Sequence, residues 1–186
     1  MRAVSTNHRI TGFTLIELIV VIVIMAILAA VALPRFTALQ RDARIAKLNA
    51  ARGSVAAATA LVHATALARN GVADTAACAG GGTDNNLTSA TGTLCTEAGL
   101  VNMVFGYPAA GAVGTPGLLS ATGLTTTFIP DAAEIAAEGY TYSAADGVST
   151  FGVTGASAAA TCFFSYTQPA AANTAPVISA ATTTGC

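Results

Sequence analysis

The sequence predicts an α+β chain in which one long N-terminal α-helix, with a transmembrane half and an amphipathic half, packs against a small antiparallel β-sheet. Three observations predict this class. An unbroken apolar run fills residues 13–33, a helical pattern continues over 35–71, and residues 139–186 begin with short β-type segments around a hairpin turn. Between them, residues 72–138 are rich in Gly, Thr, Ala and Asn and predict a loop region, in which the apolar stretch LVNMVFGYP at 100–108 is a candidate short helix or strand.

The apolar run from Phe13 to Leu33 is long enough to cross a membrane. It has 21 residues, and only Thr14 and Glu17 among them are polar. A helix of this length extends about 32 Å, against about 30 Å for the hydrocarbon core of a bilayer. Pro34 follows the run. Because proline lacks an N–H and its ring clashes with the preceding helical turn, we expect a kink there.

Glu17 is the unusual residue of this run. A carboxylate costs about 2.5–3.5 kcal/mol at the centre of a bilayer, so it marks a candidate functional residue. The alternative is a side chain that reaches back to the polar membrane surface. The choice between the two depends on what precedes the run.

The first twelve residues, MRAVSTNHRITG, are polar and carry Arg2 and Arg9. A basic segment before an apolar run is typical of a secretory signal peptide, which would here be cut after Ala30 or Ala32. Ordinary signals have an apolar region of about 7–15 residues. This run is longer, so we favour a retained membrane span over an ordinary signal.

The charges are few and unevenly distributed. Charged residues make up 9% of the chain, and all eight Lys and Arg lie at or before Arg69, whereas seven Asp and Glu follow it. The distal part is therefore acidic, and we expect no nucleic-acid partner. The basic residues between 35 and 69 suit lipid headgroups at a membrane surface, with nucleic-acid phosphate as the weaker alternative.

The four cysteines are Cys78, Cys95, Cys162 and Cys186. None forms a C-x-x-C pair, which disfavours zinc, and an even number beyond a membrane segment favours two disulfides in an oxidising compartment over free thiols. Three pairings are possible. The sequential pairing closes the shortest loops, and a loop of about 15 residues contributes about 3 kcal/mol.

Two sequence signals disagree about the orientation of the span in the membrane. Counting Lys and Arg on both flanks places the C-terminal side in the cytoplasm, because more of them follow the run than precede it. The cysteines indicate the opposite side, and a long domain is translocated despite its charge. We follow the cysteines.

The stretch GFTLIEL at residues 12–18 resembles the signature of type IV prepilins and of the related pseudopilins of type II secretion. The likeness consists of a short basic leader ending in Gly12, then Phe13, then the acidic Glu17, then the long run to Pro34. The stretch PRFTALQRDARIAKL at 34–48 further resembles the mannose-sensitive haemagglutinin group of type IV pilins. The rest of the chain resembles the family only in its general arrangement, namely two late cysteines and a small predicted sheet.

This resemblance implies the pilin fold and a processing pathway. A prepilin peptidase would remove leader residues 1–12 between Gly12 and Phe13 and methylate the new amine of Phe13. Residues 13–34 would then serve as the assembly helix of a homopolymer built by inner-membrane assembly machinery. The implied locations are the inner membrane for the single-pass precursor and an extracellular filament for the product, or the periplasm for a pseudopilin.

The resemblance also gives Glu17 a partner. Cleavage would create a positive amine at Phe13, one helical turn away, and Glu17 would pair with its own amine or, as the family pattern favours, with that of a neighbouring subunit. A paired carboxylate in an apolar filament core costs much less than an unpaired one. We therefore assign assembly to Glu17.

Residues 35–71 predict an amphipathic helix beneath a head domain. A stripe of apolar residues gives the helix one buried face; it contains Ile45, Leu48, Val55 and Val62. Asn70-Gly71 is a plausible end of the helix. His63 is interpreted as a partly buried residue on the helix face rather than a cofactor ligand or a catalytic base.

Residues 139–186 predict three or four antiparallel strands. YTYS and TFGVT flank a turn at Asp146-Gly147, and TCFFSYT at 161–167 forms a further strand. The tail has little pattern of its own. The resemblance implies that a disulfide between Cys162 and Cys186 attaches this tail to the sheet.

No catalytic constellation is present in the sequence, and we predict neither an enzyme nor a cofactor or metal. Four carboxylates, Asp131, Glu134, Glu138 and Asp146, offer a calcium site as in some pseudopilins, but such a spread is more typical of a solvated face. The functional hypotheses are a type IV pilus subunit for adhesion and possible motility, a type II secretion pseudopilin, and a membrane-anchored or secreted enzyme or binding protein. The first is favoured.

Overall fold

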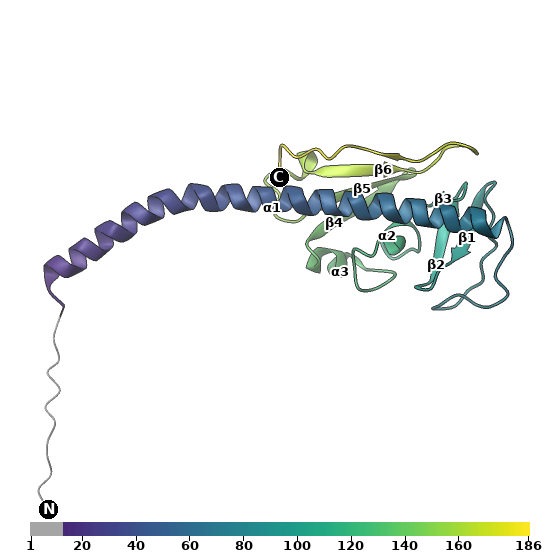
Figure 1. Ribbon diagram of the computed structural model, residues 1–186, viewed down its shortest axis with the longest axis horizontal. Coiled ribbons are helices and arrows are strands. Elements are labelled where there is room, and N and C mark those ends of the chain that lie inside the picture. Colours follow the sequence, from purple (N-terminus) through teal and green to yellow (C-terminus); the bar gives the residue numbers. More distant parts are fainter. Residues whose placement is uncertain (1–12) are drawn as a thin grey trace, which may run out of the picture. The chain divides into compact units, whose positions relative to one another are not determined.

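The computed structural model describes residues 13–186 of the chain (Figure 1). The chain divides into two compact units, one ending at Gln40 and one comprising Arg41–Cys186. Helix α1, Leu15–Arg69, is the only element with residues in both units among the described residues. All other helices and strands belong to the second unit, which is the head domain.

Helix α1 ends where the sequence predicts. Asn70 and Gly71 follow its last residue with φ values of 48° and 76°, and this left-handed backbone terminates the helix. The second half of α1 buries one stripe of side chains. Leu48, Val55 and Val62 of the predicted stripe are buried, and Ile45 is half-buried. This stripe is the face on which the head domain packs.

The predicted C-terminal sheet has four antiparallel strands in the order β4-β5-β6-β7. They are β4 (Tyr140–Ala145), β5 (Val148–Val153), β6 (Phe163–Thr167) and β7 (Val177–Ile178), and the 3-10 turn η1 (Ala159–Thr161) precedes β6. Asp146 and Gly147 join β4 to β5 with φ values of 50° and 76°, the left-handed pair of a type I′ turn. The predicted hairpin and strand count are therefore confirmed.

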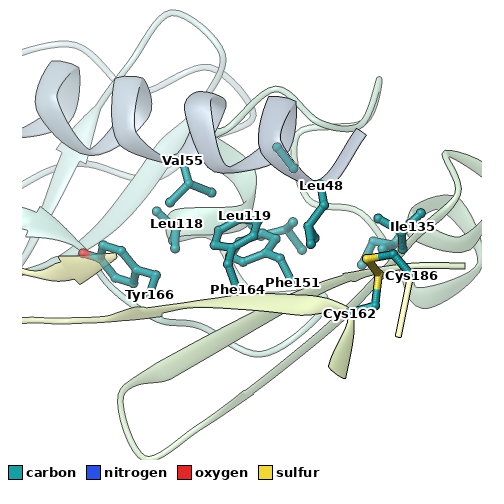
Figure 2. Close-up of a cluster of buried hydrophobic side chains, with 12 residues drawn as sticks. Leu48, Val55, Leu118, Leu119, Ile135, Phe151, Cys162, Phe164, Tyr166 and Cys186 are labelled. Carbon is teal, nitrogen blue, oxygen red and sulfur yellow. A yellow bond between two sulfur atoms is a disulfide. The ribbon is translucent and has the colours of Figure 1, made fainter. Parts of the chain in front are cut away.

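The main core lies between this sheet and α1. Figure 2 shows Leu48 and Val55 of α1 pointing toward Phe151 and Phe164, which come from β5 and β6. The two phenylalanine rings are stacked with centroids 5.0 Å apart. Burial of such side chains stabilises a fold by about 1.5–3 kcal/mol each, so these contacts attach the sheet to the helix.

The range 72–138, predicted as a loop region, contains regular structure. It carries β1 (Thr91–Cys95), β2 (Leu100–Val104) and β3 (Tyr107–Pro108), which form a second antiparallel sheet, and the short helices α2 (Leu118–Ala121) and α3 (Ala132–Ala137). Strands β2 and β3 lie in the apolar stretch 100–108, where a short helix or strand is expected, but the loop prediction was wrong for β1, α2 and α3. Strand β1 begins with Thr-Gly-Thr and carries little apolar alternation. Its pairing with β2 stabilises it instead.

A second core joins this sheet to the last turns of α1. Val62 and Ala66 of α1 are buried together with Leu94, Val101 and Met103 of β1 and β2. In Figure 1 these strands lie beside the C-terminal end of α1. The buried stripe of α1 therefore packs on the β4–β7 sheet with its earlier residues and on the β1–β3 sheet with its later ones.

Two disulfides hold the irregular segments of the head domain. Cys78 is bonded to Cys95 at the end of β1, and Cys162 before β6 is bonded to Cys186. The sequential pairing, which closes the shortest loops, is the one in the structure. Each bond restricts the freedom of the unfolded chain between its two cysteines, which favours the folded head.

Basic residues on the second half of α1 bind the head domain itself. Arg44 donates to the backbone oxygen of Cys186 at 2.8 Å, and Arg52 donates to that of Ser179 at 2.8 Å. Lys47 donates to the backbone oxygen of Glu138. The partners of these three side chains are carbonyls far away in the sequence, and contact of this basic stretch with lipid headgroups stays a prediction.

Candidate assembly site at the start of the long helix

Thr14 and Glu17 form the start of α1. The hydroxyl of Thr14 accepts a hydrogen bond from the backbone N–H of Glu17 at 3.3 Å, and the carbonyl of Thr14 accepts one from Leu18 at 3.2 Å. Thr14 is thus the N-cap, and Glu17 stands at the third helical position, where T-x-x-E sequences begin helices. The sequence prediction missed this role, although the capping pattern was there to be found.

The carboxylate of Glu17 lies at the exposed N-terminal end of the helix. Phe13, four residues earlier, is 79% exposed, and Glu17 is exposed as well. Within residues 13–186, no ion pair includes Glu17. The structure therefore leaves this charge available to a cation outside the described part of the chain.

The helix around Glu17 presents apolar surface on all sides. Every residue from Phe13 to Gln40 is exposed, including the whole predicted span to Leu33. The helix is long and apolar enough to cross a membrane. An exposed apolar surface of this size needs a lipid or protein environment, and together with the leader pattern it indicates membrane insertion.

Two further predicted residues flank this segment. Pro34 lies inside α1, which continues through it, and the hydroxyl of Thr37 donates to the carbonyl of Pro34 at 3.0 Å. A kink at Pro34 stays a prediction. Gly12, the residue before the predicted cleavage point, lies outside the described residues with the rest of the leader 1–12.

A second exposed apolar face lies on α1 within the head domain. Between residues 53 and 68, every exposed residue of the helix is Gly, Ala or Leu; these are Gly53, Ala56, Ala57, Ala60, Leu61, Ala64, Leu67 and Ala68. Small side chains permit close approach of another helix backbone. The face opposite the head core is therefore suited to helix packing.

Two of the four acidic side chains considered as a calcium alternative, Asp131 and Glu134, have structural partners. Asp131 and Glu134 form a reciprocal capping box at the start of α3, with bonds of 2.8 and 2.9 Å to each other's backbone N–H. Glu134 also accepts from the hydroxyl of Thr127. Asp146 forms the β4–β5 turn. Asp131 and Glu134 thus serve the start of α3, and Asp146 serves a turn.

Only one group of three candidate metal ligands occurs within residues 13–186, namely Asp74, Asp84 and Cys95. Cys95 is in a disulfide, and Asp84 already accepts hydrogen bonds from Arg69 at 2.9 Å and from the backbone N–H groups of Asp74 and Cys95 at 2.6 and 3.0 Å. These partners satisfy the buried carboxylate. These three residues therefore connect neighbouring segments of the head domain through hydrogen bonds and a disulfide, which is a structural role.

Comparison with known proteins supports the reading of the N-terminus. Residues 7–33 match the prokaryotic N-terminal methylation motif, a stretch that includes Gly12, Phe13 and Glu17. No characterised protein and no solved structure matches the chain. The motif supports a type IV pilin-like or pseudopilin-like protein, implies processing by a prepilin peptidase and assembly with other pilins, and indicates a structural role. The α+β arrangement matches the pilin fold.

Proposed function

We propose that this chain is a structural subunit of a type IV pilus, similar to the mannose-sensitive haemagglutinin group, which polymerises through residues 13–34 into a surface filament. The filament serves adhesion, with motility as a further role to be tested. One observation carries the proposal: the exposed apolar segment 13–33 bears a single carboxylate, Glu17, one turn from the predicted new N-terminus at Phe13.

The proposed processing step supplies the missing cation. Water cleaves the peptide bond between Gly12 and Phe13, so that Gly12 leaves with the new carboxylate and Phe13 retains the amine, which is protonated at neutral pH. Methylation of this amine leaves it protonated and positively charged. Each mature subunit then carries one ammonium and, one turn along the helix, one carboxylate.

Pairing of these charges between neighbours sets the register of the filament. When apolar helices pack around Glu17 they exclude water, and a buried charge without a partner is strongly unfavourable. At 4 Å the attraction between two unit charges is about 4 kcal/mol in surroundings of intermediate polarity. The ammonium of Phe13 in an adjacent subunit satisfies Glu17 only at one axial offset, so the pair selects that offset.

The two apolar surfaces of α1 supply the packing energy. Residues 13–33 carry Leu, Ile and Val side chains, and the face between residues 53 and 68 carries Gly and Ala together with Leu61 and Leu67. Large side chains fit against small ones when helices of different subunits lie alongside each other. In this proposal the first surface forms the filament interior, and the second borders it.

The proposed route begins at the inner membrane. The single-pass precursor waits there with its disulfide-bonded head in the oxidising compartment, and inner-membrane assembly machinery extracts it into the filament. Electron microscopy of sheared surface material, with an antibody against the head, tests this function. Labelled extracellular filaments support a pilus, whereas labelling confined to the periplasm together with a secretion defect in a deletion strain supports the pseudopilin and contradicts the proposal.

A further inference from the structure

A cavity of about 580 Å³ opens on the head domain between three parts of the chain. These are α1, the loop that joins β1 to β2, and the segment that runs from α2 to Phe128. All residues that line it belong to the second compact unit, Arg41–Cys186. Its volume is within the range of about 300–1,000 Å³ that is typical of small-molecule sites.

The walls of this cavity are mainly apolar. Helix α1 contributes Ala58 and Val62, which are buried, and Leu61, which is 67% exposed and therefore lies at the open side. Ala121 and the ring of Phe128, both half-buried, contribute further apolar surface. A ligand with an alkyl or aryl group would remove this surface from water, which favours binding.

The β1–β2 loop holds a carboxylate at the cavity. Glu97 and Ala98 lie at the tip of this loop, between Thr96 and Gly99. The carbonyl of Gly99 accepts from the backbone N–H of Thr96 at 2.9 Å and from its hydroxyl at 2.7 Å, and the N–H of Gly99 donates to the carbonyl of Thr96 at 3.2 Å. These bonds close the loop and fix the backbone that carries Glu97.

The same loop lies directly against the ring of Phe128. A Cβ atom at Gly99 would come within 2.4 Å of the ring, so only glycine leaves room for it. The ring also packs on the second core. Phe128 and the loop that carries Glu97 therefore form one wall, in which an aromatic ring and a carboxylate have a fixed relationship.

Glu97 gives the cavity a negative charge. It is exposed and is the only charged side chain among the described residues that line the cavity. Both ion pairs found within residues 13–186 belong to Arg69, so neither neutralises Glu97. The chain beyond Arg69 contains no Lys or Arg. A cleft with charge of one sign attracts the opposite sign, so this cavity favours a cation over an anion.

We propose that the cavity binds a hydrophobic organic ammonium ion, namely a protonated amine attached to an aryl or alkyl group. The apolar part of the ligand packs on Leu61 and Phe128. Its ammonium lies at Glu97, and the face of the Phe128 ring attracts the same charge. A neutral analogue gains only the apolar contacts, and an anionic analogue is repelled by Glu97.

NMR titration of the amide signals of the unassembled full-length protein tests this assignment. The unassembled form is used because Leu61 also belongs to the α1 face proposed to border the filament interior. The detergent must be uncharged, since charged headgroups would compete for the probes. The three probes are 2-phenylethylammonium, the neutral 2-phenylethanol and the anionic 3-phenylpropionate, which share one aryl group and differ in charge.

We expect saturable shifts of the Glu97 and Gly99 signals with the ammonium probe. Its affinity should exceed that of the alcohol about threefold or more, as is usual for an exposed ion pair, and the carboxylate should bind most weakly. Glu97→Gln should lower the affinity of the ammonium probe to that of the alcohol and leave the alcohol unchanged. Glu138→Gln, at another exposed carboxylate of the head, is the matched control and should change neither affinity.

Leu61→Ser tests the apolar part of the site. Leu61 is outside the core, so the melting temperature should change little, whereas the affinities of the ammonium and alcohol probes should fall by the same factor. Leu67→Ser is the matched control, because Leu67 is exposed on the same helix but does not line this cavity. It should leave both affinities unchanged.

Several outcomes overturn the proposal. They are equal affinities of the ammonium and alcohol probes in the wild type, a preference for the ammonium probe that persists in Glu97→Gln, and shifts that do not include the β1–β2 loop. Dimers that Glu97→Gln abolishes, without binding of the ammonium probe, would assign the cavity to a second copy instead. The measurement requires no filament, so its failure leaves the assembly role of Glu17 standing, and failure of assembly leaves this site standing.

Discussion

The backbone N–H of Glu17 donates a hydrogen bond to the side-chain oxygen of Thr14 at 3.3 Å. Glu17 thus takes part in the helix start through its backbone, and its carboxylate stays available for the assembly role proposed for its charge. The two roles are separable by substitution, because glutamine keeps the backbone N–H and removes the charge.

The first prediction concerns Glu17→Gln. This variant keeps the helix start and removes the carboxylate charge, so membrane insertion and leader cleavage should continue. Filament yield should fall about tenfold or more, because the ammonium of Phe13 then stays buried without a partner, at a cost of about 3–5 kcal/mol. Glu17→Ala should behave in the same way. The measurement is the amount of the protein in sheared filaments relative to the membrane fraction.

Thr14→Ala is the converse control for this prediction. It removes the N-cap, at a cost of about 1 kcal/mol, and keeps the charge. Filaments should still form in near-normal amount. If instead Glu17→Gln assembles normally and Thr14→Ala does not, the capping role is the important one and the charge pair has no part in assembly.

The second prediction concerns the exposed small-residue face of α1. Ala57→Glu places a charge on this face, which is outside the head core, so the melting temperature should change little while filament yield drops. Ala137→Glu, at an exposed position of α3, is the matched control and should assemble normally. Equal yields from the two variants would remove this face from the proposed interface.

The third prediction concerns the disulfide between Cys162 and Cys186, which are separated by 24 residues in sequence. Replacing both by Ser should lower the free energy of unfolding of the head by about 3 kcal/mol, because the unfolded chain gains freedom. Thermal melting of the full-length chain in detergent, with and without reductant, measures the effect. Reductant should destabilise the variant less than the wild type, and an identical response of both would contradict the stabilising role.

The fourth prediction concerns alkaline pH. Burial raises the pKa of Tyr142 above its usual value, against a smaller lowering by the hydrogen bond with Ser149, and burial with a contribution from Tyr107 raises the pKa of Tyr166. Unfolded tyrosines lose protons near about pH 10, whereas these two stay protonated in the fold. The contribution of these two tyrosines to stability should therefore be constant below about pH 9 and should fall as the pH rises above about 10.

Tyr166→Phe tests this assignment. The hydroxyl of Tyr166 donates to the carbonyl of Pro108 at 2.7 Å, so its loss should cost about 1–3 kcal/mol near neutral pH. The further loss of stability between about pH 9 and 11 should be smaller than in the wild type. An unchanged alkaline slope would show that other groups control it.

Local sequence patterns predicted much of the fold. The apolar run, the stripe containing Leu48 and Val55, the end of α1 at Asn70-Gly71 and the turn at Asp146-Gly147 each depend on neighbouring residues alone. For these features the periodicity or the turn chemistry is enough. The N-terminal methylation motif at residues 7–33 is also local, whereas the assembly role of Glu17 stays a prediction.

Long-range contacts explain what the sequence did not reveal. Strand β1 contains Thr and Gly and exists because it pairs with β2 over the second core. The partners of Arg44 and Arg52 lie 142 and 127 residues away, so no local pattern indicates that these charges hold the tail. The cavity likewise combines Leu61, Glu97 and Phe128 from three distant segments.

The most direct test of the charge-pair proposal is mass spectrometry of the N-terminal peptide of this protein from sheared filaments. We expect a peptide that begins with N-methylated Phe13 and contains Glu17 unmodified, so that ammonium and carboxylate are both present in the assembled subunit. A product that retains Met1, or one that begins near Val31 and so lacks Glu17, would contradict it.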